Sequence, residues 1–572
     1  MGRLRDVSIQ HFRIFKKDDL VYERAQCLYC KREMASNISK LKVHLEKCVQ
    51  YQEAATERAS TQRYFSKRRH VDAVTYATAE DQKHFERKLS AFIFGDGVPL
   101  SIVDSPRFKS LMAIMNPHYK VPTRKSLSGA ILDENYEHAL KTIEAEIRDA
   151  GSLSLVFDAW TDVCHQPVVG FIITTPTPFF WKAFHTEDTR HTADFFVEKC
   201  SNIIDQFGAH KFTAVVTDNA STMVKTRKVL EAKYPGIACY GCLAHVLNLL
   251  VGDIFKIPLP KDTITKCAAI INFFSRSALC DMIFQKKRTE LFISRDLVEP
   301  AITRWASQVA CLESFIINRP SLQLVMLDDT IASKIDSDLK KVILSDDFFI
   351  EISRLHHVLS PLKDLIGVLE SNQSVISIAI THYQAFWKLS TELDSSVSYK
   401  EELVQHISQR WNMFYHPILL LALRLDPKVN GGSIPSIISE NEDIAMIMEQ
   451  LIPDEAKRSR TFQQYFQYRA RAGPFISKHL WTVMCNASID STCWWTACFS
   501  DTAPELCELA VRVLNAPVSS ASIERTFSDY GHIHNSSRNR LTPVRSEKLV
   551  FLYHNLKELD MASDMAKMTD NN

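Results

Sequence analysis

The pattern of apolar positions divides the chain into segments with different predicted structures. Between residues 80 and 150 apolar side chains recur at helical spacing, and glycines stand where helices are expected to end, at Gly95, Gly97 and Gly151. From residue 152 the pattern changes to three short β-prone runs, SLSLVFDAWTD, QPVVGFIITT and FFWKAFHTED. The sequence therefore predicts a helical region followed by the first strands of a sheet.

Helices and strands alternate in the next segment. A helix is predicted over 192–208, with Thr192 as its N-cap and Gly208 just past its end. The apolar strand KFTAVVTDNAST, the helix MVKTRKVLEAKYPG and the short strand IACYGC follow in that order. The predicted order is therefore three strands, a helix, a strand, a helix and a strand. This order is typical of an α/β fold with a mixed sheet, and it resembles the order of an RNase H-like core.

Helical periodicity dominates most of the remaining chain. No β-prone run of comparable quality interrupts residues 265–485, which are predicted to form a large all-helical insertion. Residues 486–560 are predicted to hold two helices parted by a Pro-Val-Ser-Ser turn, and then a further helix, VRSEKLVFLYHNLKEL. The last residues, 561–572, are expected to form a disordered tail.

Four possible soft metal ligands lie near the start of the chain. Cys27 and Cys30 are separated by two residues, so both thiolates can reach one ion. His44 and Cys48 are one turn apart on one face of a helix expected to start near Ser36. Tetrahedral zinc satisfies this Cys3His set and would supply much of the folding free energy of so short a segment. The alternative is a chance grouping of reduced cysteines and a surface histidine.

Charge is distributed unevenly along the chain. The net charge of the whole chain is +1, but residues 1–70 hold 16 Lys and Arg against 8 Asp and Glu. A basic segment on a mildly acidic body indicates a polyanion-binding appendage, or else a solvated surface. Basic side chains on and just before the predicted helix suit contacts with DNA phosphates at the major groove. They are Lys31, Arg32, Lys40, Lys42 and Lys47.

Length and composition limit the class of protein. At 572 residues the chain exceeds the usual size of one hydrophobic core, so several domains are expected. The 14 cysteines show no disulfide framework, no secretory segment follows Met1, and the apolar stretches are too short for a membrane span. We expect a soluble protein with reduced thiols and no membrane partner. The basic cluster SKRRH suits nuclear import, although clusters this short are common by chance.

Two acidic residues directly follow the apolar parts of two predicted strands. Asp158 ends the first of these runs and Asp218 ends the later one, in VVTDNA. Strand ends on the same side of a mixed sheet come together, and close carboxylates repel unless a proton or cation lies between them. Mg²⁺ suits such oxygen ligands and supports phosphoryl displacement. Turn or capping roles at strand ends are the ordinary alternative.

Several motifs together resemble those of hAT-superfamily DNA transposases. Phe12 and Phe15 ahead of Cys-x2-Cys, followed by His-x3-Cys, look like a BED-type zinc finger, a family that binds DNA. The transposase-like motifs occur in the expected order: DAWTD (158–162), VVTDNA (215–220), CLAH (242–245), TRW (303–305) and APVSSASIERTFSDYGHIHNSSRNRL (516–541). The resemblance implies a DDE-type active site of Asp158, Asp218 and Glu524 that uses magnesium or manganese. Without the resemblance, Glu524 would be taken for a helix-surface residue.

The resemblance also implies DNA contacts outside the finger. Cys242 and His245 would lie beside the catalytic centre and help to position DNA, although their spacing alone favours structural packing. Trp305, next to Arg304, would stack on a base flipped out at the transposon end, although most tryptophans are simply core residues. The basic tracts QKKRTE and SSRNRL suit either phosphate contacts or a solvated face.

The predicted fold class is an α/β RNase H-like core interrupted by a large all-α insertion and preceded by a small zinc finger and a helical region. The expected domains are 1–52 (BED-type zinc finger), 53–79 (linker), 80–150 (helical DNA-binding and intertwining region), 151–264 (first part of the core), 265–485 (insertion), 486–560 (dimerisation region completing the core) and 561–572 (tail).

The expected function is that of a hAT-family DNA transposase in the nucleus. Such a protein would bind transposon ends through one zinc finger, cleave DNA with a divalent ion, form hairpins and transfer strands into target DNA. It would act as a homodimer or larger homo-oligomer. The alternative is a domesticated, transposase-derived DNA-binding protein without catalytic activity.

Overall fold

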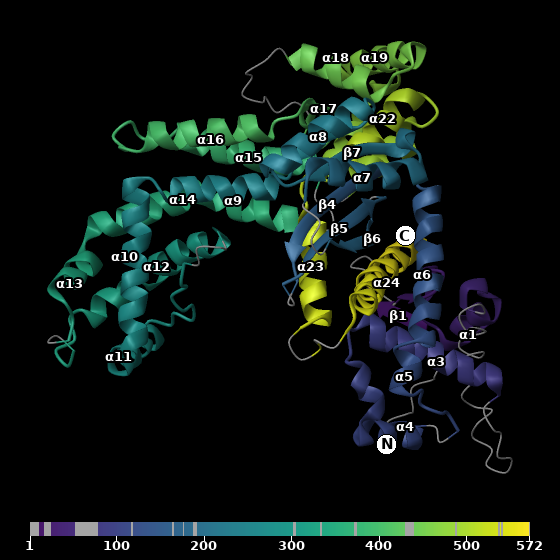
Figure 1. Ribbon diagram of the computed structural model, residues 1–572, viewed down its shortest axis with the longest axis horizontal. Coiled ribbons are helices and arrows are strands. Elements are labelled where there is room, and N and C mark those ends of the chain that lie inside the picture. Colours follow the sequence, from purple (N-terminus) through teal and green to yellow (C-terminus); the bar gives the residue numbers. More distant parts are fainter. Residues whose placement is uncertain are drawn as a thin grey trace. The chain divides into compact units, whose positions relative to one another are not determined.

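The computed structural model describes most of the chain (Figure 1). The described residues are 11–16, 24–51, 78–115, 118–162, 165–175, 177–186, 191–300, 305–331, 334–370, 375–429, 440–486, 489–535, 538 and 541–570, without the side chains of 305, 306, 366, 370, 485, 486 and 561–570. The chain forms two compact units, Met1–Lys83 with Met115–Lys120, and His84–Ile114 with Val121–Asn572. The predicted linker and the basic cluster at 66–70 fall largely or wholly outside the described residues.

In the described part of the first unit, a small sheet is followed by a helix. Strands β1, β2 and β3 pair antiparallel in that order and are followed by α1. Their bounds are Phe12–Phe15, Arg24–Cys27, Glu33–Ala35 and Ile38–Lys47. The helix starts two residues later than predicted, because Asn37 is its N-cap and accepts a hydrogen bond from the Ser39 backbone at 3.0 Å. A small core of Phe12, Ala25, Cys27, Leu41, Leu45 and Cys48 fills the unit.

The region before the large sheet is helical. It consists of α3 (Ala79–Gly95), η2 (Leu100–Asp104), α4 (Pro106–Met115), α5 (Arg124–Leu127) and α6 (Ala130–Asp149). Gly97, just after α3, has φ of 65°, a conformation that glycine adopts without steric cost. An added Cβ there would lie 2.8 Å from the Tyr553 ring, so the turn also needs glycine for space.

A five-stranded mixed sheet lies at the centre of the second unit. Its strand order is β6-β5-β4-β7-β8, with antiparallel pairing of β6, β5 and β4 and parallel pairing of β4, β7 and β8. The predicted mixed sheet is therefore confirmed, within a chain that is mostly helical. The strands are β4 (Leu153–Thr161), β5 (Pro167–Thr174), β6 (Pro178–His185), β7 (Phe212–Thr217) and β8 (Ala238–Gly241).

Opposite faces of the sheet are covered by different helices (Figure 1). Phe157 of β4 contacts Phe196 of α7 (Ala193–Phe207), with ring centroids 5.7 Å apart. Trp160, on the other face of β4 because side chains alternate along a strand, packs on Phe527 of α23 (Ala521–Ile533) at 4.1 Å. The N-cap of α7 is Thr192, as predicted, and its hydroxyl accepts a hydrogen bond from the Phe195 backbone.

One helix, α8, lies between β7 and β8, and helices also make up the chain between β8 and α23. Within the described residues they are α8 (Ser221–Lys233), α9 (Leu243–Ile254), α10 (Pro258–Arg276), α11 (Ala278–Glu290), α12 (Trp305–Val325), α13 (Ser337–Leu344), α14 (Asp346–Glu370), α15 (Ile376–Thr391), α16 (Lys400–Phe414), α17 (Pro417–Leu425), α18 (Glu440–Leu451), α19 (Glu455–Ala470), η4 (Gly473–Phe475), α20 (Lys478–Asn486), α21 (Ser491–Phe499) and α22 (Pro504–Leu514). In the described part of the chain no single helix could cross a membrane, and α9 and α10 reach the required length and hydropathy only together, across a 90° bend.

The last helix, α24 (Pro543–Asp570), covers the edge of the sheet. The Asn555 side chain accepts a hydrogen bond from the Phe180 N–H at 2.9 Å and donates one to the Phe180 carbonyl at 2.8 Å. These bonds satisfy the N–H and the carbonyl of Phe180 on edge strand β6, which would otherwise be free to pair with a strand of another chain. The helix runs to Asp570, where a disordered tail was predicted from 561, because this stretch lacks Gly and Pro and contains the helix formers Met, Ala and Lys.

Candidate zinc site and candidate active site

The structure brings together the four predicted zinc ligands of the first unit. Cys27, Cys30, His44 and Cys48 each offer one ligand atom, and these atoms all lie within 4.8 Å of one another. The Cys30 Sγ and His44 Nε2 atoms are 3.2 Å apart. Sulfur ligands of tetrahedral zinc lie about 3.8 Å from each other, given Zn–S bonds of about 2.3 Å, so the group can hold zinc.

The surroundings of His44 favour the imidazole form that binds metals. Its ring packs edge-on against Phe12, with centroids 5.9 Å apart. Burial and the nearby charge of Arg32 lower the pKa of His44, so the neutral ring is favoured at physiological pH. The aromatic residue predicted ahead of the first cysteine pair therefore helps to position and desolvate a ligand.

Replacing Cys30 with serine is expected to lower the zinc content from one ion per chain to nearly none. A serine hydroxyl is a poor zinc ligand, and three remaining ligands would bind the ion much more weakly. Zinc content measured by atomic emission spectroscopy on the purified chain tests this. Cys493→Ser, at an exposed cysteine outside the finger, is the matched control. An unchanged zinc content in Cys30→Ser would contradict the assignment.

The basic residues predicted to contact DNA are exposed on the finger. All five have solvent-exposed side chains, and three of them lie on α1. Leu41 and Leu45 of the same helix face the core, so the charged positions lie on its outer faces. The residues are Lys31, Arg32, Lys40, Lys42 and Lys47.

Asp158 lies within a strand rather than at its end. Strand β4 continues to Thr161 and pairs with β5 along this whole stretch, with Asp158 opposite Gly170. Pairing with β7 stops earlier, at Val156. The prediction that the strand ends at Asp158 is therefore wrong, because the antiparallel neighbour holds the strand after the parallel neighbour has ended. Asp158 lies two residues beyond the end of the pairing with β7.

Asp218 follows the last residue of β7 in a turn fixed by a buried arginine. Arg227 of α8 donates hydrogen bonds to the Thr217 hydroxyl at 2.5 Å, to the Asp218 carbonyl oxygen and to the Asn219 side chain at 2.9 Å. The Asp218 carboxylate accepts a hydrogen bond from the Ala220 backbone. Gly241 makes room for this arrangement, because an added Cβ would lie 2.1 Å from the Asn219 side-chain oxygen.

Glu524 lies in the first turn of α23, which rests closely on the sheet. Ile523, its neighbour, is fully buried, and an added Cβ at Gly170 would lie 2.8 Å from the Ile523 Cδ1 atom and equally near the Trp160 ring. Because Gly170 is directly opposite Asp158, this close approach sets Glu524 on the same face of the sheet as Asp158. Glu524 itself is exposed.

Asp218 and Glu524 both lie near enough to Asp158 for their charges to affect its pKa. The pKa of Asp158 is raised to about 7, mainly by burial. The charges of Asp218 and Glu524 contribute to the rise, and a hydrogen bond from the Ala159 backbone opposes it. Within the described residues, the Cys3His group is the one group of three or more His, Cys, Asp or Glu residues whose ligand atoms all lie within 4.8 Å of one another. The three acids do not form such a group. The three carboxylates are therefore spaced more widely than the zinc ligands, as like charges tend to be.

Cys242 connects the helices around the acids. It is fully buried as the N-cap of α9, and its sulfur accepts hydrogen bonds from the backbones of His245 at 3.5 Å and Ser520 at 3.2 Å. Burial raises the pKa of the Cys242 thiol, and the charge of Glu524 adds to the rise. The thiol thus ties the start of α9 to the segment that leads into α23. This geometry favours structural packing, and the His245 side chain is half-buried nearby.

Some functional candidates lie outside the described residues, and others were not predicted. Arg304 and the side chain of Trp305 are not among the described parts. The sequence reasoning missed Arg227 and Gly170, which hold two of the acid-bearing segments in place. An arginine at a position that helical periodicity assigns to the buried face of α8 was the available signal for the first. No local signal existed for the second.

Comparison with known families identifies the class of protein. Residues 475–556 match the hAT family C-terminal dimerisation region, and residues 122–270 match a domain described as one of unknown function, DUF659. No curated protein matches the chain. Together with the Cys3His group, these matches place the chain among transposase-type proteins. The matches support a hAT-family transposase or a derivative of one, and the Cys3His group fits a BED-type finger.

Proposed function

We propose that the protein is a hAT DNA transposase whose active site consists of Asp158, Asp218 and Glu524. The observation that carries the proposal is that the charges of Asp218 and Glu524 both act on the buried Asp158. The three acids come from a buried strand, the end of its parallel neighbour and a helix far along the chain. The sheet order, with antiparallel β6-β5-β4 and parallel β4-β7-β8, supports an RNase H-like core.

Each acid is supported by a different part of the fold. The antiparallel pairing of β4 with β5 supports Asp158, the Arg227 hydrogen bonds support the Asp218 turn, and the close contact of α23 with Gly170 supports Glu524. Such fixed geometry is what in-line displacement at phosphorus requires. Magnesium or manganese bound by the carboxylates would activate a water molecule or a 3′ hydroxyl and neutralise charge on the leaving oxygen.

The reaction would begin with hydrolysis of a phosphodiester at the transposon end. The same acids would then direct hairpin formation on the flanking DNA and transfer of the 3′ hydroxyl into target DNA. Asp158, with a pKa of about 7, can exchange a proton at neutral pH, so binding of a cation there competes with a proton. We expect weaker divalent-ion binding as the pH falls below 7.

DNA binding, assembly and location complete the proposal. The exposed basic residues of the finger would contact the phosphates of transposon ends. His245, Arg304 and Trp305 would contact DNA beside the active site, with Cys242 positioning His245. The match to the dimerisation region supports a homodimer or larger homo-oligomer. The proposed location is the nucleus, where the DNA substrate is found.

A divalent-dependent nicking assay tests the proposal. DNA from the genomic flanks of the gene, end-labelled, is incubated with the full chain in magnesium, manganese or EDTA. The parent is expected to nick this DNA only with a divalent ion, and Asp158→Asn is expected to nick at least ~10²-fold more slowly, because it removes a charge at the reacting centre. Asp149→Asn, at the exposed acid that ends α6, is the matched control and should behave like the parent.

Two results would contradict catalysis at these residues. Equal nicking by the parent and Asp158→Asn would mean that the acids are not the active site. No nicking by either, with DNA binding intact, would instead support a zinc-dependent DNA-binding protein derived from a transposase. DNA binding and zinc content are measured on the same preparations, so loss of folding is recognised separately.

A further inference from the structure

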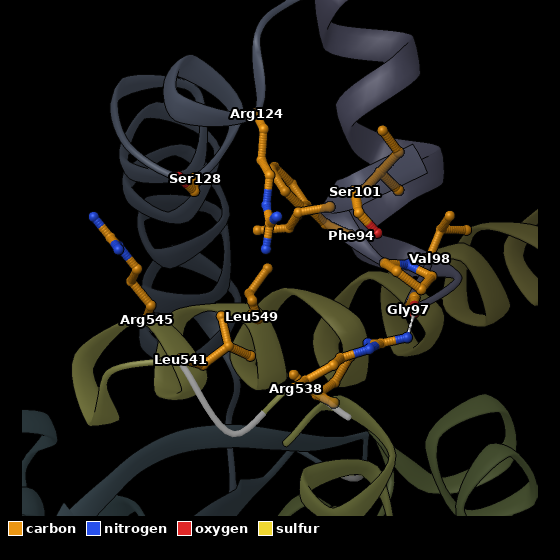
Figure 2. A pocket seen from close by; sticks show the side chains of 14 residues that line it. Phe94, Gly97, Val98, Ser101, Arg124, Ser128, Arg538, Leu541, Arg545 and Leu549 are labelled. Carbon is orange, nitrogen blue, oxygen red and sulfur yellow. Dashed lines mark hydrogen bonds between the residues drawn. The ribbon is translucent and has the colours of Figure 1, made fainter. Parts of the chain in front are cut away.

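A cavity of about 390 Å³ lies within the second unit, between the helical region before the sheet and the C-terminal block (Figure 2). One wall comes from the end of α3, η2 and α5, and the other from the end of α23, Arg538 and the start of α24. The cavity is open to solvent on one side and its size suits a small ligand or a single nucleotide unit.

Three arginines line the cavity, and none of the described residues that line it is acidic. They are Arg124 from α5, Arg538 from the turn after α23, and Arg545 from the first turn of α24. Figure 2 shows Arg124 extending toward Leu549 across the cavity, while Arg538 reaches Gly97. Three guanidinium groups without a carboxylate among the lining residues make the cavity strongly attractive to an anion.

The three arginines differ in the hydrogen bonds that their side chains form within the protein. Arg538 donates a hydrogen bond to the Gly97 carbonyl oxygen at 2.9 Å and is half-buried, so it joins the two walls. In the described part of the chain the side chains of Arg124 and Arg545 form neither an ion pair nor a hydrogen bond. The three arginines come from segments far apart in the sequence and line one cavity, although Figure 2 shows that their guanidinium groups point in different directions. An anion bound in the cavity would offset the repulsion among these like charges.

We infer that this cavity binds a phosphate group of a DNA strand, with Arg124 and Arg545 as its main contacts and Arg538 as the residue that holds the walls together. Guanidinium groups match phosphate oxygens in bidentate geometry. The rest of the lining is largely apolar, including Phe94, Leu541 and Leu549, and offers a surface for the adjoining deoxyribose. The inference rests on the proposed function, and it adds a DNA contact remote from the finger.

The test measures how DNA affinity depends on salt. Phosphate contacts carry no sequence information, so a labelled random-sequence duplex of about 30 base pairs is sufficient. Binding of the full chain is measured by fluorescence anisotropy in EDTA, which excludes cleavage, between about 50 and 200 mM salt. Each lost phosphate contact lowers the slope of log affinity against log salt by about 0.9. Arg124→Ala/Arg545→Ala removes the contacts to one phosphate, so it is expected to lower the slope by about 0.9 and to weaken binding about tenfold at the lowest salt.

The matched control removes the same charge elsewhere. Arg276→Ala changes an exposed arginine on α10 that does not line the cavity, and it should keep the parent's slope. Arg124→Lys/Arg545→Lys keeps the charge and should retain most of the slope. Because Arg124 and Arg545 have no internal partners, both double variants should melt within a few degrees of the parent.

Free phosphate could also occupy the cavity, and a second measurement separates the two sources. Thermal unfolding is followed with inorganic phosphate and, separately, with a deoxynucleoside monophosphate. If either stabilises the parent but not Arg124→Ala/Arg545→Ala, while the DNA slope is unchanged, the cavity takes a free phosphate and the inference is overturned. An unchanged slope without such stabilisation overturns it as well. A parent that does not bind DNA at all would instead refute the proposed function.

Discussion

Replacing Gly170 with alanine is expected to lower the free energy of unfolding by about 1–3 kcal/mol and the rate of DNA nicking by about 10²-fold. The new Cβ would lie 2.8 Å from both the Ile523 Cδ1 atom and the Trp160 ring, so α23 must move away from β5. Both neighbours are packed, since Ile523 is fully buried and Trp160 contacts Phe527. The shift would move Glu524 away from Asp158. Chemical denaturation and the nicking assay measure the two effects.

Two further variants separate this steric effect from the general effect of an added methyl group. Gly151→Ala is the matched control, because nothing lies within 4 Å of its Cβ position and the residue is exposed. Gly170→Ala/Ile523→Val removes the clashing Cδ1 atom and should recover part of the stability and of the nicking rate. If Gly170→Ala is as stable and active as Gly151→Ala, the close contact of α23 does not position Glu524.

Replacing Arg227 with alanine is expected to lower the free energy of unfolding by about 3–4 kcal/mol. The guanidinium is buried and donates to three oxygen atoms of consecutive residues, from Thr217 to Asn219. Burial lowers the pKa of Arg227, although the nearby charge of Asp218 opposes the shift. Its removal leaves buried acceptors without donors and loosens the turn that carries Asp218. Urea unfolding followed by circular dichroism measures the change.

Lys228→Ala is the matched control for this prediction. Lys228 follows Arg227 on α8 but is exposed, so its loss should change stability by less than about 0.5 kcal/mol. Arg227→Lys keeps one positive charge but cannot reach three acceptors at once, and it should fall between the parent and Arg227→Ala. A fully stable Arg227→Ala would show that the turn after β7 is held by other contacts.

Local patterns in the sequence were sufficient for the elements and for the zinc ligands. Thr192 was predicted as an N-cap because the helix signal depends on a few neighbouring residues. The four ligands of the finger lie within one short segment, so their spacing alone determines that they can meet. The mixed sheet followed from the alternation of strand and helix patterns.

The candidate active site could not be predicted from local patterns alone. Asp158 was expected at a strand end, but its strand continues because β5 pairs beyond the point where β7 stops. Strand length depends on partners that the local sequence does not show. The importance of Gly170 depends on Ile523, and the pairing of Glu524 with Asp158 depends on the same helix. Only the family resemblance pointed to Glu524.

The bonds between Asn555 and Phe180 have a consequence for synthesis of the chain. The two residues are 375 positions apart, so strand β6 leaves the ribosome long before the helix that covers its edge. At about 5–20 residues per second, roughly 20–75 s pass before Asn555 is made. During that interval the nascent sheet presents an unpaired edge to neighbouring chains. We therefore expect aggregation and the need for chaperones to be greatest during this interval, before translation is complete.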